Sequence, residues 1–451
     1  MAEYVTGQRE RRRVAVVGSG VAGLTAAHVF ASAGRHVTLY EADHRLGGHA
    51  DTHLVDVGGR IVPVDTGFIV HNDRTYPTLL RLFAELGVET RDSDMSMSIR
   101  VDGTPDQRGI EYAGALGARG LFPSVRNLLD LAYLRMLTEV KRFHRHATEI
   151  LASPVDPEGD EETLRAFVTR VGLSEYFTTR FLRPLVAAVW SCDPARALDY
   201  PARYLFAFLD HHGMLTVFGS PTWRTVVGGS RCYVEKVAAG LDEVRVGRAV
   251  TGVVETDDAV WVTDATGDTD AYDAVVLAGH PHQSLAMLTQ PSAAQREVLG
   301  AMTYTTNHAQ LHTDESVLPT RRAARASWNY WQRPDDDREP VLVTYDISRL
   351  MGIDEPDRRF LVTLGGEDRV DPATVIDTMT YEHPLYTPET LAAQRKLPSI
   401  TTSRIAFAGA YHGWGFHEDG ALSGVVAARH LGVEWATVAD RDAVVAVAVA
   451  S

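Results

Sequence analysis

The sequence predicts an α/β protein of two domains, one of which has a Rossmann-type fold. Three observations lead to this fold class. Residues 13–41 read as strand, glycine-rich turn, helix, strand and acidic residue. Strand patterns return at 244–278 after a long section with helical patterns. The chain has 451 residues, which is more than one hydrophobic core usually serves.

The turn after the first strand carries Gly18, Gly20 and Gly23, the spacing of the dinucleotide-binding fingerprint. Gly18 permits the tight turn, Gly20 lets a pyrophosphate approach bare backbone, and Gly23 lets the helix pack closely on the sheet. The helix begins with Val21 and Ala22, and its free N–H groups and partial positive charge favour phosphate. We assign all five residues to cofactor binding.

An acidic residue ends the second strand at the place that the fingerprint requires. Glu41 follows Gly18 by 23 residues and is expected to accept hydrogen bonds from the adenosine ribose, with Ala42 beside it. A carboxylate there would repel a 2′-phosphate, so NADP is disfavoured.

Composition limits the class of protein further. Apolar residues make up 45% and charged residues 23%, as in an ordinary soluble globular protein. The net charge of −15 argues against nucleic acid as a partner. The only cysteines, Cys192 and Cys232, do not form a disulfide framework and suit the reducing cytoplasm, where we expect the protein. The longest apolar run, Ala443–Ala450, is too short to span a membrane.

The first half of the chain continues with a hairpin around 58–59 and a helix over 78–86 that Gly87 would cap. Strands are expected within 93–112, and helices dominate 121–176, notably 127–150. The arginines and lysine of this last helix could bind an anionic membrane surface, but we favour a solvated outer face.

The second half alternates between helix and strand. The patterns predict a helix ending near Leu241, strands over 244–254, 259–262 and 271–278, and a buried strand from Ile405 that leads into a helix from Ala421. Residues 291–399 form a separate section. Motifs of metalloproteases and serine hydrolases do not occur, and adjacent His211 and His212 would point to different faces, so no metal site is predicted.

The residues after Glu41 resemble one family. An Arg-x-Gly-Gly turn and an Asp-x-Gly loop look like the FAD-binding half of the amine oxidase and phytoene desaturase superfamily. The resemblance implies that the turn lies along the FAD phosphates and the loop beside the flavin, which assigns Arg45, Gly47, Gly48, Gly67 and Phe68 to the cofactor. Relatives often have a second arginine where this chain has His49.

Two later segments extend the resemblance. It places the backbone of Val250 against adenine, and it places the C-terminal glycine-rich loop and helix start against the ribityl chain and flavin. The residues so assigned are Gly409, Ala410, Glu418, Asp419 and Ala421. Many relatives carry an acid at the position of Ala410, so the ribityl contact is expected from Asp419 or from backbone.

The resemblance implies a discontinuous Rossmann-type FAD-binding domain with an inserted mixed α+β substrate domain. We expect the first in residues 1–75, 220–290 and 400–451, and the second in 76–219 and 291–399. No cysteine stands in the C-terminal loop, so the FAD is expected to be non-covalent.

The implied function is that of an FAD-dependent oxidoreductase that moves hydride from a substrate carbon to flavin N5. Finer motifs resemble uncharacterised flavoproteins related to the extra domain of plant cyclopropane fatty acid synthases. This makes a lipid acyl chain the leading substrate and an amine the second. No second GxGxxG occurs, so substrate is expected to reduce the flavin, with oxygen, a quinone or another carrier as acceptor.

Six side chains are candidates for the substrate pocket: His71, Tyr76, Trp328, Tyr330, Trp414 and His417. His71 and His417 are the favoured catalytic groups, because each follows a stretch expected near the flavin and would titrate near neutral pH. Two other classes stay open. The protein could be a flavin-dependent isomerase or hydratase, or a non-catalytic partner protein that FAD stabilises.

Overall fold

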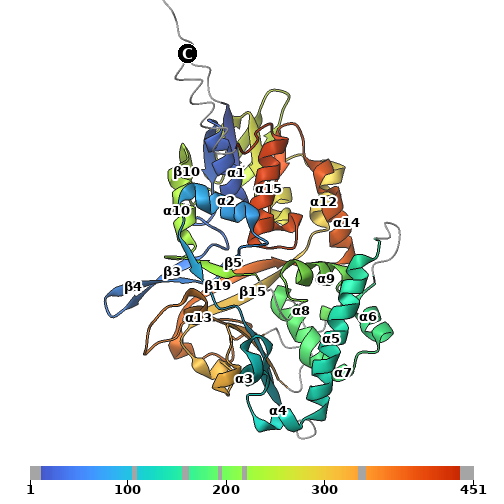
Figure 1. Ribbon diagram of the computed structural model, residues 1–451. Coiled ribbons are helices and arrows are strands. Elements are labelled where there is room, and N and C mark those ends of the chain that lie inside the picture. The colour runs from blue at the N-terminus through green and yellow to red at the C-terminus, as the bar shows by residue number, and fades with distance from the viewer. Residues whose placement is uncertain are drawn as a thin grey trace, which may run out of the picture.

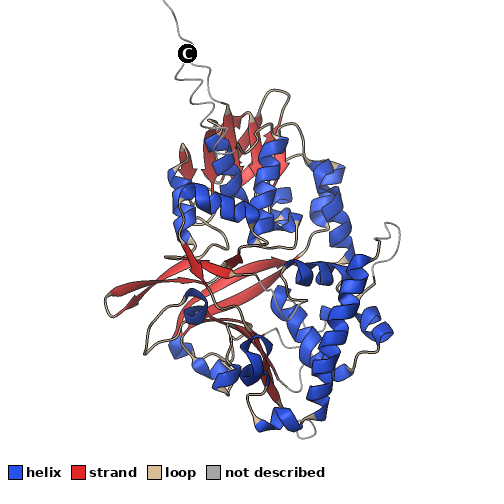
Figure 2. Cartoon of the chain, in the orientation of Figure 1, coloured by secondary structure: helices blue, strands red, loops and turns tan. Residues whose placement is uncertain are grey.

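The computed structural model describes residues 12–103, 109–154, 162–190, 196–215, 221–333 and 342–436. Figures 1 and 2 show a sheet flanked by helices at one end of the molecule, and a second sheet beside a group of helices at the other. Cys232 is a free thiol, whereas Cys192 and the apolar run 443–450 lie outside the described residues.

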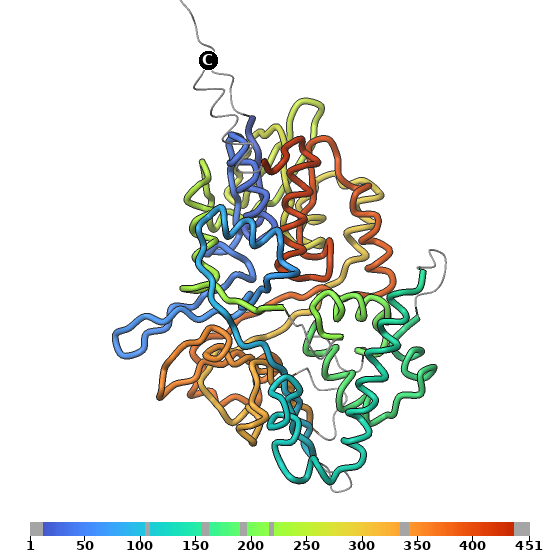
Figure 3. The backbone as a smooth tube through the Cα atoms, viewed as in Figure 1, coloured from blue at the N-terminus to red at the C-terminus, as the bar shows by residue number. Residues whose placement is uncertain are grey.

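The first sheet has five parallel strands in the order β10-β2-β1-β14-β20. The strands come from three sections of chain, which Figure 3 follows by colour: β1 (Arg13–Val17), β2 (His36–Tyr40), β10 (Glu243–Arg245), β14 (Ala274–Leu277) and β20 (Ile405–Phe407). Val14 to Val17 are all buried, as an inner parallel strand covered on both faces requires. The predicted interrupted Rossmann-type α/β fold is confirmed.

Four helices pack their apolar side chains together on one face of this sheet: α1 (Val21–Ser32), α2 (Pro77–Leu86), α10 (Arg231–Ala239) and α15 (His417–His430). Gly87 ends α2 in the left-handed conformation, as predicted. α15 begins at His417 rather than at Ala421, because Asp419 Oδ2 accepts the N–H of Phe416 and caps the helix. α2 lies in the section assigned to the substrate domain, and the domain boundaries stay a prediction.

The other face of the sheet is covered by a small antiparallel sheet and three helices, which share one buried cluster with Ala15 and Val17. They are β11 (Val250–Glu255), β12 (Val260–Asp264), β13 (Thr269–Tyr272), α11 (Pro281–Met287), α12 (Ala293–Gly300) and α14 (Pro388–Lys396).

The second large sheet has seven strands, and all neighbours are antiparallel except β16 and β7. In spatial order they are β19 (Val375–Pro384), β15 (Tyr304–His312), β18 (Leu361–Leu364), β17 (Leu342–Asp346), β16 (Trp328–Gln332), β7 (Met97–Val101) and β8 (Ile110–Ala113). The predicted hairpin is β3 (Thr52–Val57) with β4 (Arg60–Asp65). A small sheet contains β5 (His71–Asn72), β9 (Trp223–Val226) and β6 (Thr90–Asp92).

The helical group packs beside this sheet around buried rings that include Tyr133, Phe143 and Phe206. Its helices include α3 (Gly117–Leu121), α4 (Val125–Leu129), α5 (Leu131–Ala152), α6 (Leu164–Val171), α8 (Arg183–Trp190) and α9 (Ala202–His211). The predicted helix 127–150 is broken at Asp130, whose carboxylate accepts the N–H of Tyr133 and starts α5. Within the described ranges, no helix is both long and apolar enough to cross a membrane.

Candidate functional site

The glycine-rich turn between β1 and α1 is packed closely except at one position. Gly18 has a φ of 104°, and a Cβ there would lie 2.9 Å from the carbonyl oxygen of Ala278. A Cβ on Gly23 would lie 1.9 Å from the oxygen of Gly18. Nothing lies within 4 Å of a Cβ built on Gly20. Gly18 and Gly23 are therefore needed by the fold, whereas the space beside Gly20 is open to a ligand.

The N-terminus of α1 offers donors to an anion. No side chain caps the helix, and its first turn carries no acidic residue. Arg45 pairs with Asp51 through Nη2 at 3.0 Å, while its buried Nη1 has no hydrogen-bond partner among the described residues. Free helix N–H groups and an unpartnered guanidinium nitrogen together fit the diphosphate of a dinucleotide.

The Arg-Gly-Gly turn lies directly against this turn, and the Gly67 loop lies against the Arg-Gly-Gly turn. A Cβ on Gly48 would be 3.2 Å from the Cα of Gly20, so the two turns meet backbone to backbone. A Cβ on Gly67 would be 2.2 Å from the carbonyl oxygen of His49, which also accepts the N–H of Phe68 at 2.6 Å. Gly47 has a φ of 114°, which favours glycine.

Glu41 ends β2 beside the same turn. Its Oε2 accepts hydrogen bonds from the N–H and hydroxyl groups of Ser19, and its Oε1 accepts the N–H of Asp43. The chain that leads to Val250 runs alongside, since the N–H of Arg248 donates to the carbonyl of Glu41 at 2.8 Å. The predicted ribose and adenine residues therefore lie in neighbouring segments.

The C-terminal motif meets the first motif through two glycines of α15. A Cβ on Gly420 would be 2.6 Å from Val21 Cγ1, and one on Gly424 would be 2.3 Å from the oxygen of Ala22. Figure 1 shows α1 and α15 side by side. Two predicted dinucleotide motifs from opposite ends of the chain thus begin their helices at one place.

Two acids in the first turn of α15 hold neighbouring backbone. Glu418 accepts the N–H groups of Thr78 at 2.9 Å and Leu79 at 3.0 Å, at the start of α2. Asp419 accepts the N–H of Phe416 at 2.9 Å, and desolvation raises its pKa to about 7. Whether Glu418, Asp419, Gly409, Ala410 and Ala421 also touch the cofactor stays a prediction.

His71 and His417 belong to one aromatic group near these motifs. His417 stacks on Phe68 with ring centroids 3.7 Å apart, and its Nε2 lies 3.0 Å from the hydroxyl of Tyr233. His71 is fully buried, and neither of its ring nitrogens has a hydrogen-bond partner among the described residues. Its ring meets Phe83 edge-on at 5.3 Å.

The expectation that these histidines titrate near neutral pH is wrong. Burial, followed by the charge of Arg224, lowers the pKa of His71 to about 4. Burial, followed by His71, lowers the pKa of His417 to about 3. Both imidazoles are therefore neutral at physiological pH, and each can donate through one nitrogen and accept through the other.

The other pocket candidates occupy different surroundings. Tyr76 is buried beside His71, with the two rings 6.3 Å apart. Trp328 meets Tyr345 edge-on at 5.2 Å. Tyr330 is buried in the helical core, against which Trp414 also packs.

An aromatic layer joins α9 to the C-terminal loop. Phe208 stacks on Phe416 at 5.0 Å, and Trp414 lies 5.0 Å from His211 and 6.5 Å from Tyr204. Tyr204 and Tyr386 both donate their hydroxyl groups to the carbonyl of Gly413. Sequence reasoning found only Trp414 here, because α9 contributes its rings from a distant segment without a motif.

A polar network that the sequence did not reveal ties the Arg-Gly-Gly turn to β19. Tyr381 donates its hydroxyl to Asp51 at 2.8 Å and lies 2.7 Å from the hydroxyl of Thr66. Burial acts to raise the pKa of Asp51, but the imidazole of His53, whose Nε2 lies 3.5 Å from Asp51 Oδ1, and the charge of Arg45 hold it below its usual range. This network fixes the segment that carries Arg45.

Several histidines gather beside it. His49, at the position where relatives often have arginine, lies 5.6 Å from His383 and 6.3 Å from His280 between ring centroids. His280 Nδ1 lies 2.7 Å from Glu382 Oε2. His280, His282 and Glu382 each offer one atom that can bind a metal ion, and these three atoms lie within 4.8 Å of one another.

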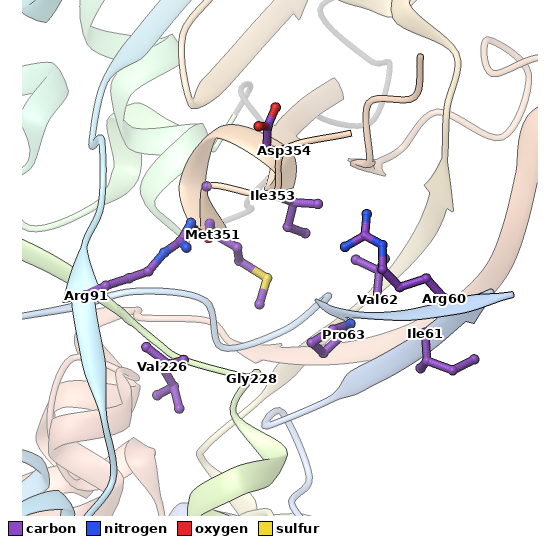
Figure 4. Close-up of a pocket in the computed structure, with 12 residues that line it drawn as sticks. Arg60, Ile61, Val62, Pro63, Arg91, Val226, Gly228, Met351, Ile353 and Asp354 are labelled. Carbon is purple, nitrogen blue, oxygen red and sulfur yellow. Dashed lines mark hydrogen bonds between the residues drawn. The ribbon is translucent and has the colours of Figure 1, made fainter. Parts of the chain in front are cut away.

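A cavity of about 220 Å³ lies between β4 and α13 (Ile347–Met351), and Figure 4 shows residues that line it. Arg60, Pro63, Gly228 and Met351 are among its lining residues, and none of the predicted site residues is. Arg91 donates to the carbonyl of Met351 at its edge. The cavity is therefore not part of the predicted cofactor site.

Comparisons with known proteins give one consistent result. A family model described as flavin containing amine oxidoreductase matches residues 21–432. A Mycobacterium tuberculosis protein with the provisional name flavin-containing monoamine oxidase AofH is 27% identical over 409 residues, which cover 81% of this chain and 82% of that protein.

Two solved structures have the same fold. The cyclohexylamine oxidase of Brevibacterium oxydans matches with a TM-score of 0.67 at 15% identity, over 93% of this chain and 98% of that one. The CLA-producing fatty acid isomerase of P. acnes matches with a TM-score of 0.66 at 16% identity and the same coverage. At these identities the likeness concerns the fold alone.

Proposed function

The chain belongs to the family of flavin-containing amine oxidoreductases and is an FAD-dependent oxidoreductase, and on this premise we propose that it oxidises a carbon of a small apolar substrate. A lipid acyl chain is the leading substrate. When bound, FAD supplies the two-electron acceptor, whose N5 takes hydride from the substrate carbon.

The residues proposed to hold FAD are arranged along the cofactor from its adenosine end to its flavin. Glu41 and Ala42 bind the ribose, and the backbone of Val250 meets adenine. The open space beside Gly20, the N-terminus of α1 and the unpartnered Nη1 of Arg45 support binding of the diphosphate. The proposed neighbours of the ribityl chain and flavin are Gly67, Phe68, Gly409, Ala410, Glu418, Asp419 and Ala421.

One observation carries the choice of an apolar substrate. The layer beside the C-terminal loop consists of Tyr204, Phe208, Trp414 and Phe416 with His211, and the hydroxyl of Tyr204 already donates to Gly413. Phe208 is buried, and Tyr204, Trp414 and Phe416 are partly buried against the helical core. This layer leaves few polar groups for a substrate beside it, and a charged group brought there would lose its hydration without a partner. Aromatic faces with neutral histidines suit an acyl chain.

His71 is the proposed catalytic side chain, since its two ring nitrogens, which have no hydrogen-bond partner among the described residues, can accept or donate a proton at the substrate. His417 is proposed as a positioning residue, because Phe68 and Tyr233 hold its ring.

Amine oxidation is the second candidate, supported by the family model that matches the chain, which is described as flavin containing amine oxidoreductase. The isomerase or hydratase alternative would use the same residues without net oxidation. Cytoplasmic location, weak association with a membrane surface, and oxygen, a quinone or another carrier as acceptor complete the proposal.

Product analysis tests the proposal. The holoenzyme is incubated in air with dispersed phospholipid or with benzylamine, and products are followed by mass spectrometry. We expect an acyl chain that has lost two hydrogens and gained a double bond. The Gly20→Val variant should give no such product. Conversion of benzylamine to its aldehyde without a lipid product would support the amine alternative instead.

A further inference from the structure

Four large aliphatic side chains are exposed at one end of the helical group. Val125, Leu128 and Leu129 of α4 and Leu131 of α5 have 71%, 52%, 76% and 81% of their surface exposed. Positions 125, 128 and 129 have the spacing of one helix face. Asn127 points inward, since it is buried and its Nδ2 donates to the carbonyl of Glu111 at 3.1 Å. α4 thus turns its apolar face outward, the reverse of an ordinary surface helix.

This end lies far from the cofactor motifs. Figure 1 shows α4 and the start of α5 at the opposite end of the molecule from the parallel sheet. α5 has 22 residues, which makes it roughly 33 Å long. The exposed side chains therefore have no contact with the proposed reaction site.

Four exposed arginines lie on α4, on the preceding α3 and in a segment that contacts α3. Arg119 of α3 and Arg126 of α4 are exposed, and so are Arg321 and Arg322, in a segment that contacts α3. Across the described ranges, none of these four guanidinium groups forms an ion pair. Asp130 is the one acid between residues 114 and 135, and it caps α5. The nearby Glu111 accepts the N–H groups of Thr320 and Arg321. Within the described segment 114–135 the charge is positive, although the chain as a whole carries −15.

We propose that this tip, defined as Val125, Leu128, Leu129 and Leu131 with Arg119 and Arg126, docks the protein on an anionic lipid bilayer. The aliphatic side chains would enter the boundary between headgroups and acyl chains, and the arginines would pair with lipid phosphates. Docking is interfacial, since no described helix can span the bilayer.

Charge favours a bilayer over a second copy of the chain as the occupant. A symmetric contact through the tip would place the same arginines against each other without a counter-charge. The inference extends the proposed membrane association and gives an acyl substrate its source. Vesicle binding tests the docking, whereas product analysis tests the reaction, so either can fail alone.

The test measures co-sedimentation of the full-length holoenzyme with vesicles of phosphatidylcholine alone or mixed equally with phosphatidylglycerol. We expect binding to the mixed vesicles that weakens as salt rises. The single substitutions Leu129→Ser and Leu131→Ser should each weaken vesicle binding roughly tenfold. Arg119→Gln with Arg126→Gln should weaken binding to the mixed vesicles only.

Matched controls use exposed residues elsewhere. Leu54 and Ile61 of the β3–β4 hairpin are 52% and 55% exposed, and Leu54→Ser with Ile61→Ser should leave binding unchanged. Arg296→Gln on α12 is the control for charge. Failure to bind mixed vesicles, equal binding to phosphatidylcholine, or an equal loss in the controls would overturn the proposal. The proposal would also fail if the protein bound no vesicles and formed a dimer that the Leu129→Ser substitution dissociates.

Discussion

The ring of His417 lies flat against the ring of Phe68, with centroids 3.7 Å apart and planes inclined by 7°. Phe68 follows the Gly67 loop and His417 opens α15, so this pair joins two predicted flavin motifs from opposite ends of the chain. Tyr233 fixes the Nε2 of His417 at 3.0 Å. His71, by contrast, has two buried nitrogens without a partner in the described part of the chain. The two histidines therefore have different roles in our account.

Replacing Gly20 by valine should abolish FAD binding and leave the fold intact. Gly20 has a φ of −64°, which any residue adopts, and no atom of the described residues lies within 4 Å of its Cβ position. The new side chain would fill the space proposed for the diphosphate. Flavin content after gel filtration measures binding, and thermal unfolding of the apoprotein measures folding.

Gly23→Val is the contrasting control, because a Cβ there would lie 1.9 Å from the oxygen of Gly18. We expect this variant to lose several kcal/mol of stability, on the order of a core overpacking defect or more. A Gly20→Val protein that retains its FAD would contradict our account of the turn.

His71→Ala should retain FAD and slow flavin reduction by substrate about 10²-fold or more, the usual contribution of a general acid or base. His417→Ala should mainly weaken FAD affinity, because it frees Phe68 and Tyr233, and His417→Gln should restore part of it. Rapid-mixing absorbance and fluorescence titration measure the two effects separately. Since the pKa values are about 4 and about 3, neither histidine should cause an inflection near pH 6.5 in the reduction rate. Equal losses of the flavin reduction rate in both alanine variants would contradict the separate roles of His71 as the catalytic residue and His417 as a positioning residue.

The fold and the cofactor motifs could be predicted because they depend on local backbone requirements. Gly18 needs a positive φ and Gly23 a close approach, and both demands leave glycine in the sequence. The sequence predicted the start of α15 at Ala421, after Gly420, because glycine is typical of a loop. The helix begins at His417 instead, because the side chain of Asp419 caps it.

The missing parts of the site depend on distant pairings. Tyr381 reaches Asp51 across 330 residues, and strand alternation in β19 does not say which partner it meets. Burial of His71 decides its pKa, and no motif reports burial. The link to the flavoprotein domain of plant cyclopropane fatty acid synthases, and the domain boundaries, stay predictions.

Acid should destabilise the apoprotein. His71, His212 and His312 are buried with pKa values of about 4, because burial disfavours their charged forms. Below about pH 6.5 the unfolded chain binds protons that the native histidines refuse, so stability falls until about pH 4, by about 1.4 kcal/mol per pH unit for each histidine.

Two carboxyl groups act in the opposite direction and offset part of this loss. Desolvation raises the pKa of Asp65 to about 6 and that of Asp419 to about 7, so their native forms keep protons that the unfolded chain releases. Denaturant unfolding at about pH 7.5 and about pH 5.5 measures the net change. His312→Asn should reduce it, whereas a variant of the exposed His430 should not. Stability that rises on acidification would be inconsistent with the buried neutral histidines.

The FAD should be non-covalent, with one flavin per chain. No cysteine occurs in the segment from Gly409 to Gly424 that we place beside the flavin. Precipitation with acid should therefore release all flavin into the supernatant, where absorbance against protein concentration gives the ratio. A pellet that keeps its yellow colour after washing would show a covalent bond.

An acyl substrate, and not a nicotinamide nucleotide, should reduce the flavin, since the sequence contains one GxGxxG motif. Anaerobic stopped-flow mixing of the oxidised holoenzyme with dispersed phospholipid, benzylamine, NADH or NADPH tests it directly. We predict bleaching of the flavin absorbance by the phospholipid and none by either nucleotide. Rapid bleaching by NADH or NADPH with no response to lipid would contradict the account and make double-bond reduction the leading reaction.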